Sequence, residues 1–177
     1  MPVYEIEMGQ GISTGCNTFQ VCTTTLYTCT FIGAAGPERA GAFHYPSKAL
    51  GRYRQSTIKA MTDWIEDIEP TQICLVFAEG CGMKIGDQED GTGLLDQANL
   101  KSWAKQMCKN GLVRTDKATS RIVSVNEGRV DAGSSADFAS LGGRKIDLKR
   151  HKAGVHVFMN GQPEFSLWGR NEEMNPN

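Results

Sequence analysis

Cys16 is the residue whose surroundings most favour nucleophilic chemistry. It ends the glycine-rich segment 9–16 (GQGISTGC), where three glycines in the seven preceding positions predict a turn. Backbone amides that point inward from such a turn lower the pKa of a thiol and stabilise an oxyanion. We therefore expect Cys16 to be a nucleophile, with Gly15 and Gln10 as candidate oxyanion or substrate-binding residues. The competing interpretation makes Cys16 a small core residue, as most free cysteines are.

A nucleophilic thiol needs a base, and the chain contains three histidines. An imidazole titrates near neutral pH, so a histidine within hydrogen-bond reach can accept the proton of a thiol. His151 stands in a charged run that is typical of solvated surface, and His156 falls in a predicted hairpin, where we expect a structural role. His44, which lies between a predicted strand and a proline, is therefore the candidate base.

The segments around these residues are predicted to be mostly β-structure. Alternating apolar and polar residues predict a strand at 3–8, and residues 19–32 are rich in β-branched and aromatic side chains, which predicts one long strand or a hairpin. Glycines and a proline at 33–37 predict a break. A short strand at 41–45 then ends beside His44.

Two helices are predicted farther along the chain. Apolar residues at helical spacing predict a helix at 47–68, capped by Ser47, and another at 96–110, followed by Gly111 as a C-terminal cap. A continuous apolar run at 72–77 predicts a buried strand between them. The chain is then expected to return to a sheet within 113–125 and to close with a hairpin at 155–168. This order predicts a mixed α/β domain.

Length and composition fit one domain, 1–177, with a flexible tail at 171–177. Lys plus Arg number 19 and Asp plus Glu 20, so the net charge of −1 gives no electrostatic argument for nucleic acid or an anionic membrane. Because we find neither a membrane-length apolar run nor a signal-peptide pattern, we expect a cytoplasmic start and reduced thiols for the six cysteines. The cysteine and histidine spacings predict no metal site, and nothing predicts a cofactor.

The order of short motifs along the chain resembles the CheD receptor glutamine deamidases. Each motif is short, and their common order from about residue 9 to residue 157 is what carries the resemblance. The segments that are similar to the family are 11–16 (GISTGC), 41–46 (GAFHYP), 77–83 (FAEGCGM), 85–86 (IG), the helix that holds Asn99 and Leu100, 110–112 (NGL), 142–146 (GGRKI) and 154–157 (GVHV).

The resemblance implies a fold and a reaction. The implied fold is a mixed β-sheet sandwich flanked by helices, as in CheD. The implied reaction is deamidation of a protein glutamine, in which Cys16 attacks the carboxamide, His44 protonates the departing ammonia, and water hydrolyses the thioester. The catalytic domain of cytotoxic necrotizing factor and related toxins has the same Cys and His arrangement, so the implied substrate is either a chemoreceptor or a host signalling protein.

Two departures from the family pattern concern the site. CheD-type enzymes usually carry a threonine six residues before the nucleophile, which orients the histidine, and Gln10 occupies that position here. Ser13 or Thr14 is a possible substitute, as is a backbone carbonyl, which the toxin branch suggests. The interval of 28 between Cys16 and His44 (44 − 16) is also longer than is usual in the family. A longer hairpin between them would explain it.

Two other classes of function fit the same residues. One is a binding module that keeps the fold without the chemistry, and the other is a different cysteine hydrolase, such as a transglutaminase, peptidase or thioesterase. For the deamidase we expect a protein substrate as partner, no nucleic acid and no membrane insertion. We expect it in the cytoplasm or delivered into a host cell without a cleaved signal.

Overall fold

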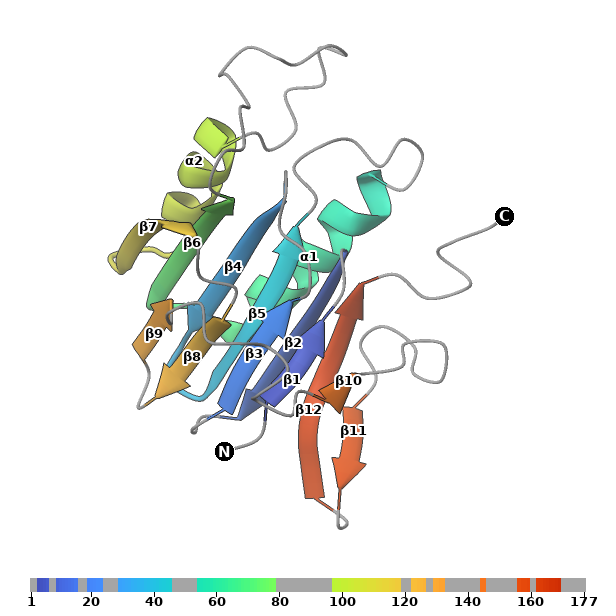
Figure 1. Cartoon of the computed structure of the whole chain (residues 1–177). Coiled ribbons are helices and arrows are strands. Elements are labelled where there is room, and N and C mark those ends of the chain that lie inside the picture. Colours follow the sequence, from blue (N-terminus) through green and yellow to red (C-terminus); the bar gives the residue numbers. More distant parts are fainter. Residues whose placement is uncertain are drawn as a thin grey trace.

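The computed structural model describes residues 3–6, 9–15, 19–23, 29–45, 54–78, 97–118, 122–126, 129–132, 144–145, 156–159 and 162–169. Within these ranges the chain forms two helices and twelve strands that are divided between two sheets (Figure 1).

The larger sheet has seven strands in the order β11-β12-β2-β5-β4-β6-β7, and only the last pair, β6 and β7, is parallel. The C-terminal strand β12 thus lies inside the sheet, next to one of the first strands of the chain. The bounds of the strands, in the order of the sheet, are His156–Met159, Gln162–Gly169, Gln10–Gly15, Arg39–Tyr45, Thr30–Ala35, Gln72–Ala78 and Leu112–Ala118.

The smaller sheet has five strands in the order β10-β1-β3-β8-β9. Strand β1 is parallel to both of its neighbours, and the other pairs are antiparallel. The bounds, in the order of the sheet, are Arg144–Lys145, Val3–Ile6, Phe19–Thr23, Ile122–Asn126 and Arg129–Ala132.

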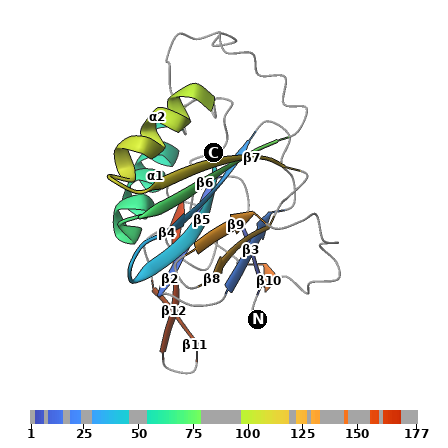
Figure 2. The same cartoon turned by 90° about the vertical axis from the view of Figure 1, so that its left-hand side faces the viewer.

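The elements are arranged in three layers. Helices α1 (Arg54–Ile68) and α2 (Gln97–Met107) cover one face of the seven-stranded sheet, and the five-stranded sheet lies against its other face (Figure 2). The predicted α/β class is therefore confirmed.

The core between the helices and the seven-stranded sheet is here called the helix-side cluster. Trp64 of α1 packs against Phe43 of β5 with a ring separation of 5.5 Å, and its indole nitrogen donates a hydrogen bond of 2.9 Å to the carbonyl of Ile12. This contact fixes α1 across the centre of the sheet. The buried members of the cluster are Ile32, Ala34, Phe43, Tyr45, Ala60, Met61, Trp64, Ile65, Ile68, Ile73, Leu75, Phe77, Leu100, Trp103, Ala104 and Cys108.

The predicted turn at 9–16 is confirmed only at Gly9, which has a positive φ of 83°, because residues 10–15 form β2. The strand pairs with β12 on one side and β5 on the other, so its backbone amides belong to two ladders. A side chain at Gly11 would place its Cβ 2.3 Å from the ring of Phe43. This glycine therefore allows a close approach between strands and does not mark a turn.

The segment 19–32 is neither one strand nor a hairpin. Its first part is β3 in the five-stranded sheet, and its end begins β4 in the seven-stranded sheet. The predicted break begins later than expected, because β4 continues through Gly33 to Ala35 and the chain turns at 36–38 before β5. Small residues at these positions suit a central strand with buried faces.

The remaining predictions agree better with the structure. The strands β1 and β6, both helices and the pairing of β11 with β12 are confirmed. The described part of α1 begins at Arg54, and Ser47, the predicted cap, lies outside the described residues. After α2, the left-handed residue that ends the helix is Asn110, with φ of 59°, and not Gly111. The tail at 171–177 is outside the described residues.

Candidate active site

His44 lies on the face of the seven-stranded sheet that is turned away from the helices. Its neighbour Phe43 belongs to the helix-side cluster, and successive side chains of a strand point to opposite faces. His44 therefore points toward the five-stranded sheet, and it is only 2% exposed. The prediction of a histidine close to the end of a strand is confirmed, because β5 ends one residue later at Tyr45.

Burial lowers the pKa of His44 from 6.5 to about 4, because the protein around the ring solvates the charged imidazolium poorly. The ring is consequently neutral at pH 7, and a neutral imidazole carries one nitrogen lone pair that can accept a proton. A thiolate formed beside the ring would favour the protonated form and oppose the effect of burial.

In the ladder between β2 and β5, His44 lies far along the strand from Gly15, the last residue of β2. Gly15, the last described residue before Cys16, pairs with Arg39, which lies five positions before His44 on β5. At about 3.4 Å per residue, those five positions span roughly 17 Å. Cys16 itself lies outside the described residues. Its pairing with His44 stays a prediction.

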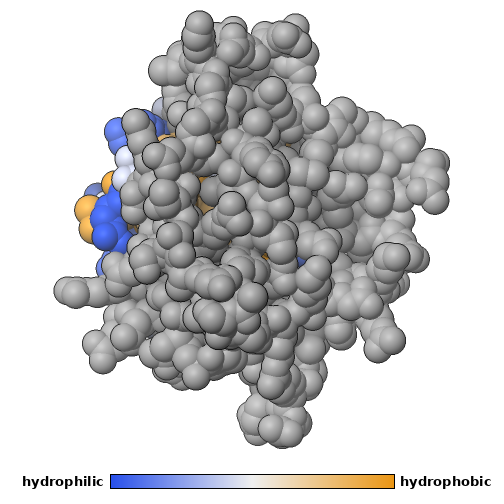
Figure 3. Space-filling view, viewed as in Figure 1, coloured by the Kyte–Doolittle hydropathy of each residue, from blue (hydrophilic) through white to orange (hydrophobic). Residues whose placement is uncertain are grey.

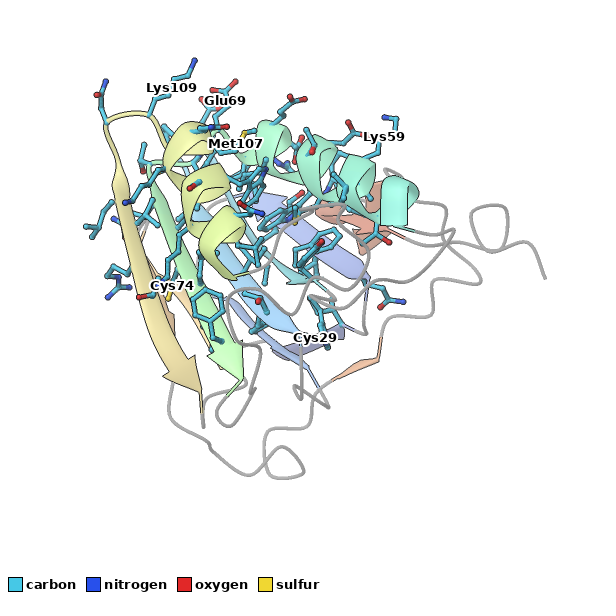
Figure 4. All side chains as sticks on the ribbon, turned by 90° about the horizontal axis from the view of Figure 1, so that it is seen from above. Cys29, Lys59, Glu69, Cys74, Met107 and Lys109 are labelled. Atoms are coloured by element: carbon cyan, nitrogen blue, oxygen red, sulfur yellow. The ribbon has the colours of Figure 1, made fainter. Side chains whose placement is uncertain are left out.

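A different cysteine lies beside His44. In the ladder between β4 and β5, Phe31 pairs with His44, and Cys29 is two residues before Phe31. Cys29 and Phe31 are buried but do not belong to the helix-side cluster, whereas Ile32 does. Figure 4 also shows Cys29 on the side of the sheet away from the helices. Cys29 is therefore a diagonal neighbour of His44 on the same face, a relation that brings Cβ atoms within roughly 7 Å.

The thiol of Cys29 is not part of a disulfide and is largely shielded, with the residue 9% exposed. Among the described residues Cys74 and Cys108 are also buried and outside disulfides, but neither has His44 beside it on the ladder: Cys74 pairs with Gly33, and Cys108 follows α2. Geometry thus singles out Cys29, which the sequence analysis treated only as a member of a β-rich segment.

Two sequence signals point to the same residue once the register is known. Cys29 precedes His44 by 15 positions (44 − 29), so no enlarged hairpin is needed. The position six residues before Cys29 is Thr23, the residue type that the CheD resemblance requires there. Thr23 ends β3, and β3 contacts β5 across the two sheets. With Cys29 in place of Cys16, these two features agree with the resemblance, whereas segment 11–16 no longer ends in the nucleophile.

Ser13 is brought into a different group, here called the polar cluster: Ser13, Arg39, Asp67, Ser166 and Trp168. The Ser13 hydroxyl donates to Asp67 Oδ2 at 2.8 Å and accepts from Arg39 Nη2 and Trp168 Nε1, both at 3.0 Å. Arg39 also donates to Asp67 Oδ2 at 2.7 Å and to Ser166 Oγ at 3.2 Å. Because Asp67 belongs to α1, Ser13 faces the helices, and the sheet separates it from His44. The prediction that Ser13 orients His44 is wrong.

Thr14 shares the face of His44 but not its position along the sheet. It pairs with Ala40, four positions from His44, which is roughly 14 Å along the strand. Gly15 is exposed at the end of β2, and its pairing with Arg39 places it in the ladder. Gln10 is buried at the other end, next to Gly9, whose amide donates to the carbonyl of His44 at 2.8 Å. Of the predicted group, only Gln10 therefore lies at the His44 end.

No protein-family model, curated protein or solved structure matches the chain. The assignment of the site therefore depends on its geometry and on the order of the motifs. In the part of the chain that the structure describes, no three His, Cys, Asp or Glu side chains gather as metal ligands would. Neither described helix has the length and apolar character needed to cross a membrane.

Proposed function

We propose that the chain is a protein glutamine deamidase in which Cys29 is the nucleophile and His44 is its base. The observation that carries this proposal is the pairing of Phe31 with His44, which sets Cys29 on the same face of the sheet and diagonal to the imidazole. A CheD-like arrangement of two sheets and flanking helices is part of the proposal.

The reaction follows from a thiol beside a neutral imidazole. His44 accepts the proton of Cys29 as sulfur forms a bond to the carboxamide carbon of a glutamine side chain. The imidazolium then gives the proton to the leaving nitrogen, the C–N bond breaks, and ammonia departs from a thioester. A water molecule, deprotonated by the same imidazole, hydrolyses the thioester and restores the thiol. The products are glutamate and ammonia.

The frame around Cys29 suits this role. Strand β4 begins one residue after the thiol and pairs with β5 and β6 on its two sides, so the backbone next to the nucleophile is held in register. Rigid strands position reacting groups more accurately than loops do.

Conversion of glutamine into glutamate adds a negative charge to the substrate protein, which is sufficient to switch an interface of a chemoreceptor or a host signalling protein.

The experiment compares two cysteine variants, Cys29→Ala and Cys16→Ala. Ammonia release is measured with a blocked glutaminyl-glycine dipeptide and with unfolded casein, and modified casein peptides are examined for the gain of about 1 Da that deamidation produces. Loss of a nucleophile in such a site lowers kcat by about 10³-fold or more, so we expect this loss for Cys29→Ala and near-normal activity for Cys16→Ala. The opposite pattern would return the nucleophile to Cys16.

A labelling experiment tests the Cys29 and His44 pair without any substrate. Iodoacetamide alkylates the thiolate, and mass spectrometry of peptides gives the rate at each cysteine. Cys74 is the matched control, because it is buried, faces the same way as Cys29 and lies away from His44. We expect His44→Gln to slow labelling of Cys29 and to leave Cys74 unchanged. An equal change at both cysteines would mean that the substitution only loosened the core, if labelling becomes faster, or tightened it, if labelling becomes slower.

The low exposure of Cys29 favours one alternative, a binding module without catalysis. A thiol that a substrate carbonyl cannot reach would contribute packing alone. This alternative predicts no ammonia release from any glutamine substrate and slow labelling of Cys29 that is insensitive to His44→Gln. Cleaved or cross-linked casein, in contrast, would indicate a peptidase or a transglutaminase.

A further inference from the structure

Strand β7 is the last strand on one side of the seven-stranded sheet (Figure 1). Among the described strands it pairs with β6 alone, so only one side of its backbone has a neighbour. Its first residue, Leu112, is 54% exposed and is the one large apolar residue of the described chain that is exposed. Figure 3 shows apolar and hydrophilic side chains together at the margin of the molecule where β7 lies. The edge of such a strand is a template for pairing with another strand.

The ladder with β6 shows which residues of β7 direct their backbone groups away from the sheet. The amide of Leu112 donates a hydrogen bond of 2.9 Å to the carbonyl of Thr71, just before β6. The register is unbroken from 112 to 118, and successive residues of a strand direct their backbone groups to alternate sides. The residues directed toward β6 are therefore Leu112, Arg114, Asp116 and Ala118, and those directed outward are Val113, Thr115 and Lys117.

The order of residues in β7 is complementary to itself in the opposite direction. Thr115 is the middle residue of the strand, which runs Leu112–Ala118. When two copies are aligned antiparallel about Thr115, Arg114 of each copy lies opposite Asp116 of the other. The outward residues of the two copies also lie opposite one another, so that each such pair exchanges two backbone hydrogen bonds. Arg114 and Asp116 fall at the positions between these bonds, where opposite side chains are closer.

The same residues disfavour other alignments of the two strands. A slide of one residue sets the outward groups of one copy against residues of the other whose backbone faces β6. A slide of two residues sets Arg114 opposite Arg114, or Asp116 opposite Asp116. Like charges directly opposite each other destabilise a strand pair, whereas opposite charges and paired threonines stabilise it. The charges of β7 thus favour the alignment that pairs its full length.

We infer that two copies of this chain associate through β7, as an antiparallel strand pair with a two-fold axis through Thr115. The same surface of each copy meets the other, as two-fold symmetry requires. The two seven-stranded sheets then form one continuous sheet. Leu112, the exposed apolar residue, lies opposite Ala118 of the second copy. The association is independent of the chemistry proposed for Cys29.

The experiment measures the mass of the protein in solution by sedimentation velocity at increasing concentration. For the unmodified protein we expect the mass of one chain to change into that of two. Arg114→Asp and Asp116→Arg each set like charges opposite each other at two places, so each variant alone should associate about tenfold more weakly. An equimolar mixture of the two variants should restore association, because a pair with one copy of each again has opposite charges at both places.

Lys59→Asp is the matched control, because it makes the same change of charge at an exposed position of α1, which packs over β12, β2 and β5. It should leave association unchanged. Thr115→Pro removes an outward N–H that the ladder with β6 does not use, so it should abolish association in a folded protein. Thermal unfolding shows whether each variant is folded.

Three results would overturn the inference. One is the mass of a single chain at every concentration of the unmodified protein. Another is a species of two chains that both charge variants leave intact. The third is a mixture of the two charge variants that associates no better than each variant alone.

Discussion

The two faces of the seven-stranded sheet bury polar groups in different ways. On the helix side, the polar cluster joins β2, β5, α1 and β12 through hydrogen bonds among its own members. On the other face, His44 is a titratable group that burial holds neutral at pH 7. A buried polar side chain that is hydrogen-bonded to its neighbours contributes to the stability of the fold. A buried base whose pKa is shifted is instead characteristic of a functional site. The contrast supports the proposal that the face of the sheet with His44 carries the chemistry.

The largest expected effect that tests this contrast is the pH dependence that His44 gives to the free energy of unfolding. Its pKa is about 4 in the folded protein and 6.5 in the unfolded chain, so between these values the unfolded chain binds a proton that the folded protein does not. Lower pH therefore favours unfolding. The free energy of unfolding should be unaffected above pH 6.5 and should fall by about 3 kcal/mol as the pH drops to 4.

Urea denaturation across this pH range measures the loss, and proton NMR of the imidazole measures the pKa directly. The variant His44→Gln should lose this part of the pH dependence. An NMR pKa near 6.5 would show that water reaches the ring, and it would remove the physical difference between the two faces.

A smaller effect is expected when the polar cluster loses its carboxylate. In Asp67→Ala, Arg39 loses the acceptor of its 2.7 Å ion pair, and the fully buried hydroxyl of Ser13 loses its acceptor as well. Because Arg39 and Asp67 are about a quarter exposed, with side-chain exposures of 26% and 28%, solvent reduces the cost. We expect the free energy of unfolding, from urea denaturation, to fall by about 2 kcal/mol.

Asp63→Ala is the control on the same helix. Asp63 pairs with Lys59 at 2.7 Å, but the side chains are 41% and 74% exposed, so its loss should lower the free energy of unfolding far less than the loss of Asp67. Similar losses for the two variants would mean that the polar cluster is an ordinary surface network.

The smallest expected effect comes from Ser13→Ala, which tests whether Ser13 takes part in catalysis. Ser13→Ala should lower the free energy of unfolding by about 1 kcal/mol, because Trp168 Nε1 and Asp67 each lose a hydrogen-bond partner. It should leave kcat/KM for ammonia release unchanged, since the sheet stands between Ser13 and His44. A large fall in kcat/KM in a fully folded variant would restore Ser13 to the active site.

The sequence was sufficient to predict elements that have a clear period or a continuous apolar run. Both helices bury an apolar face at helical spacing, and β6 is apolar along most of its length. The place of His44 near the end of a strand was also predicted correctly, whereas its role as a base stays a prediction. These signals lie within short segments, so they can be recognised in the sequence without knowing which elements pack against one another.

The errors came from features that only tertiary contacts decide. Glycines can mark a turn or permit close approach, and the ring of Phe43 against Gly11 makes the second role the correct one in β2. Residues 19–32 favour β-structure throughout, so the sequence does not indicate where the chain leaves the five-stranded sheet and enters the seven-stranded sheet. Cys29 was not considered as a nucleophile because the resemblance was anchored on the glycines before Cys16, and its place beside His44 follows only from the register of β4 against β5.

The position of β12 inside the larger sheet has a consequence for how the molecule is made. Ser166 pairs with Ser13, so two residues synthesised more than 150 positions apart must meet before β2 has both neighbours. A nascent chain that lacks β12 leaves one side of β2 open to other strands, and such long-range pairing slows folding. The hydrogen bonds from Arg39 to Ser166 and from Trp168 to Ser13 therefore join β5 and β2 to β12 only after β12 has been synthesised.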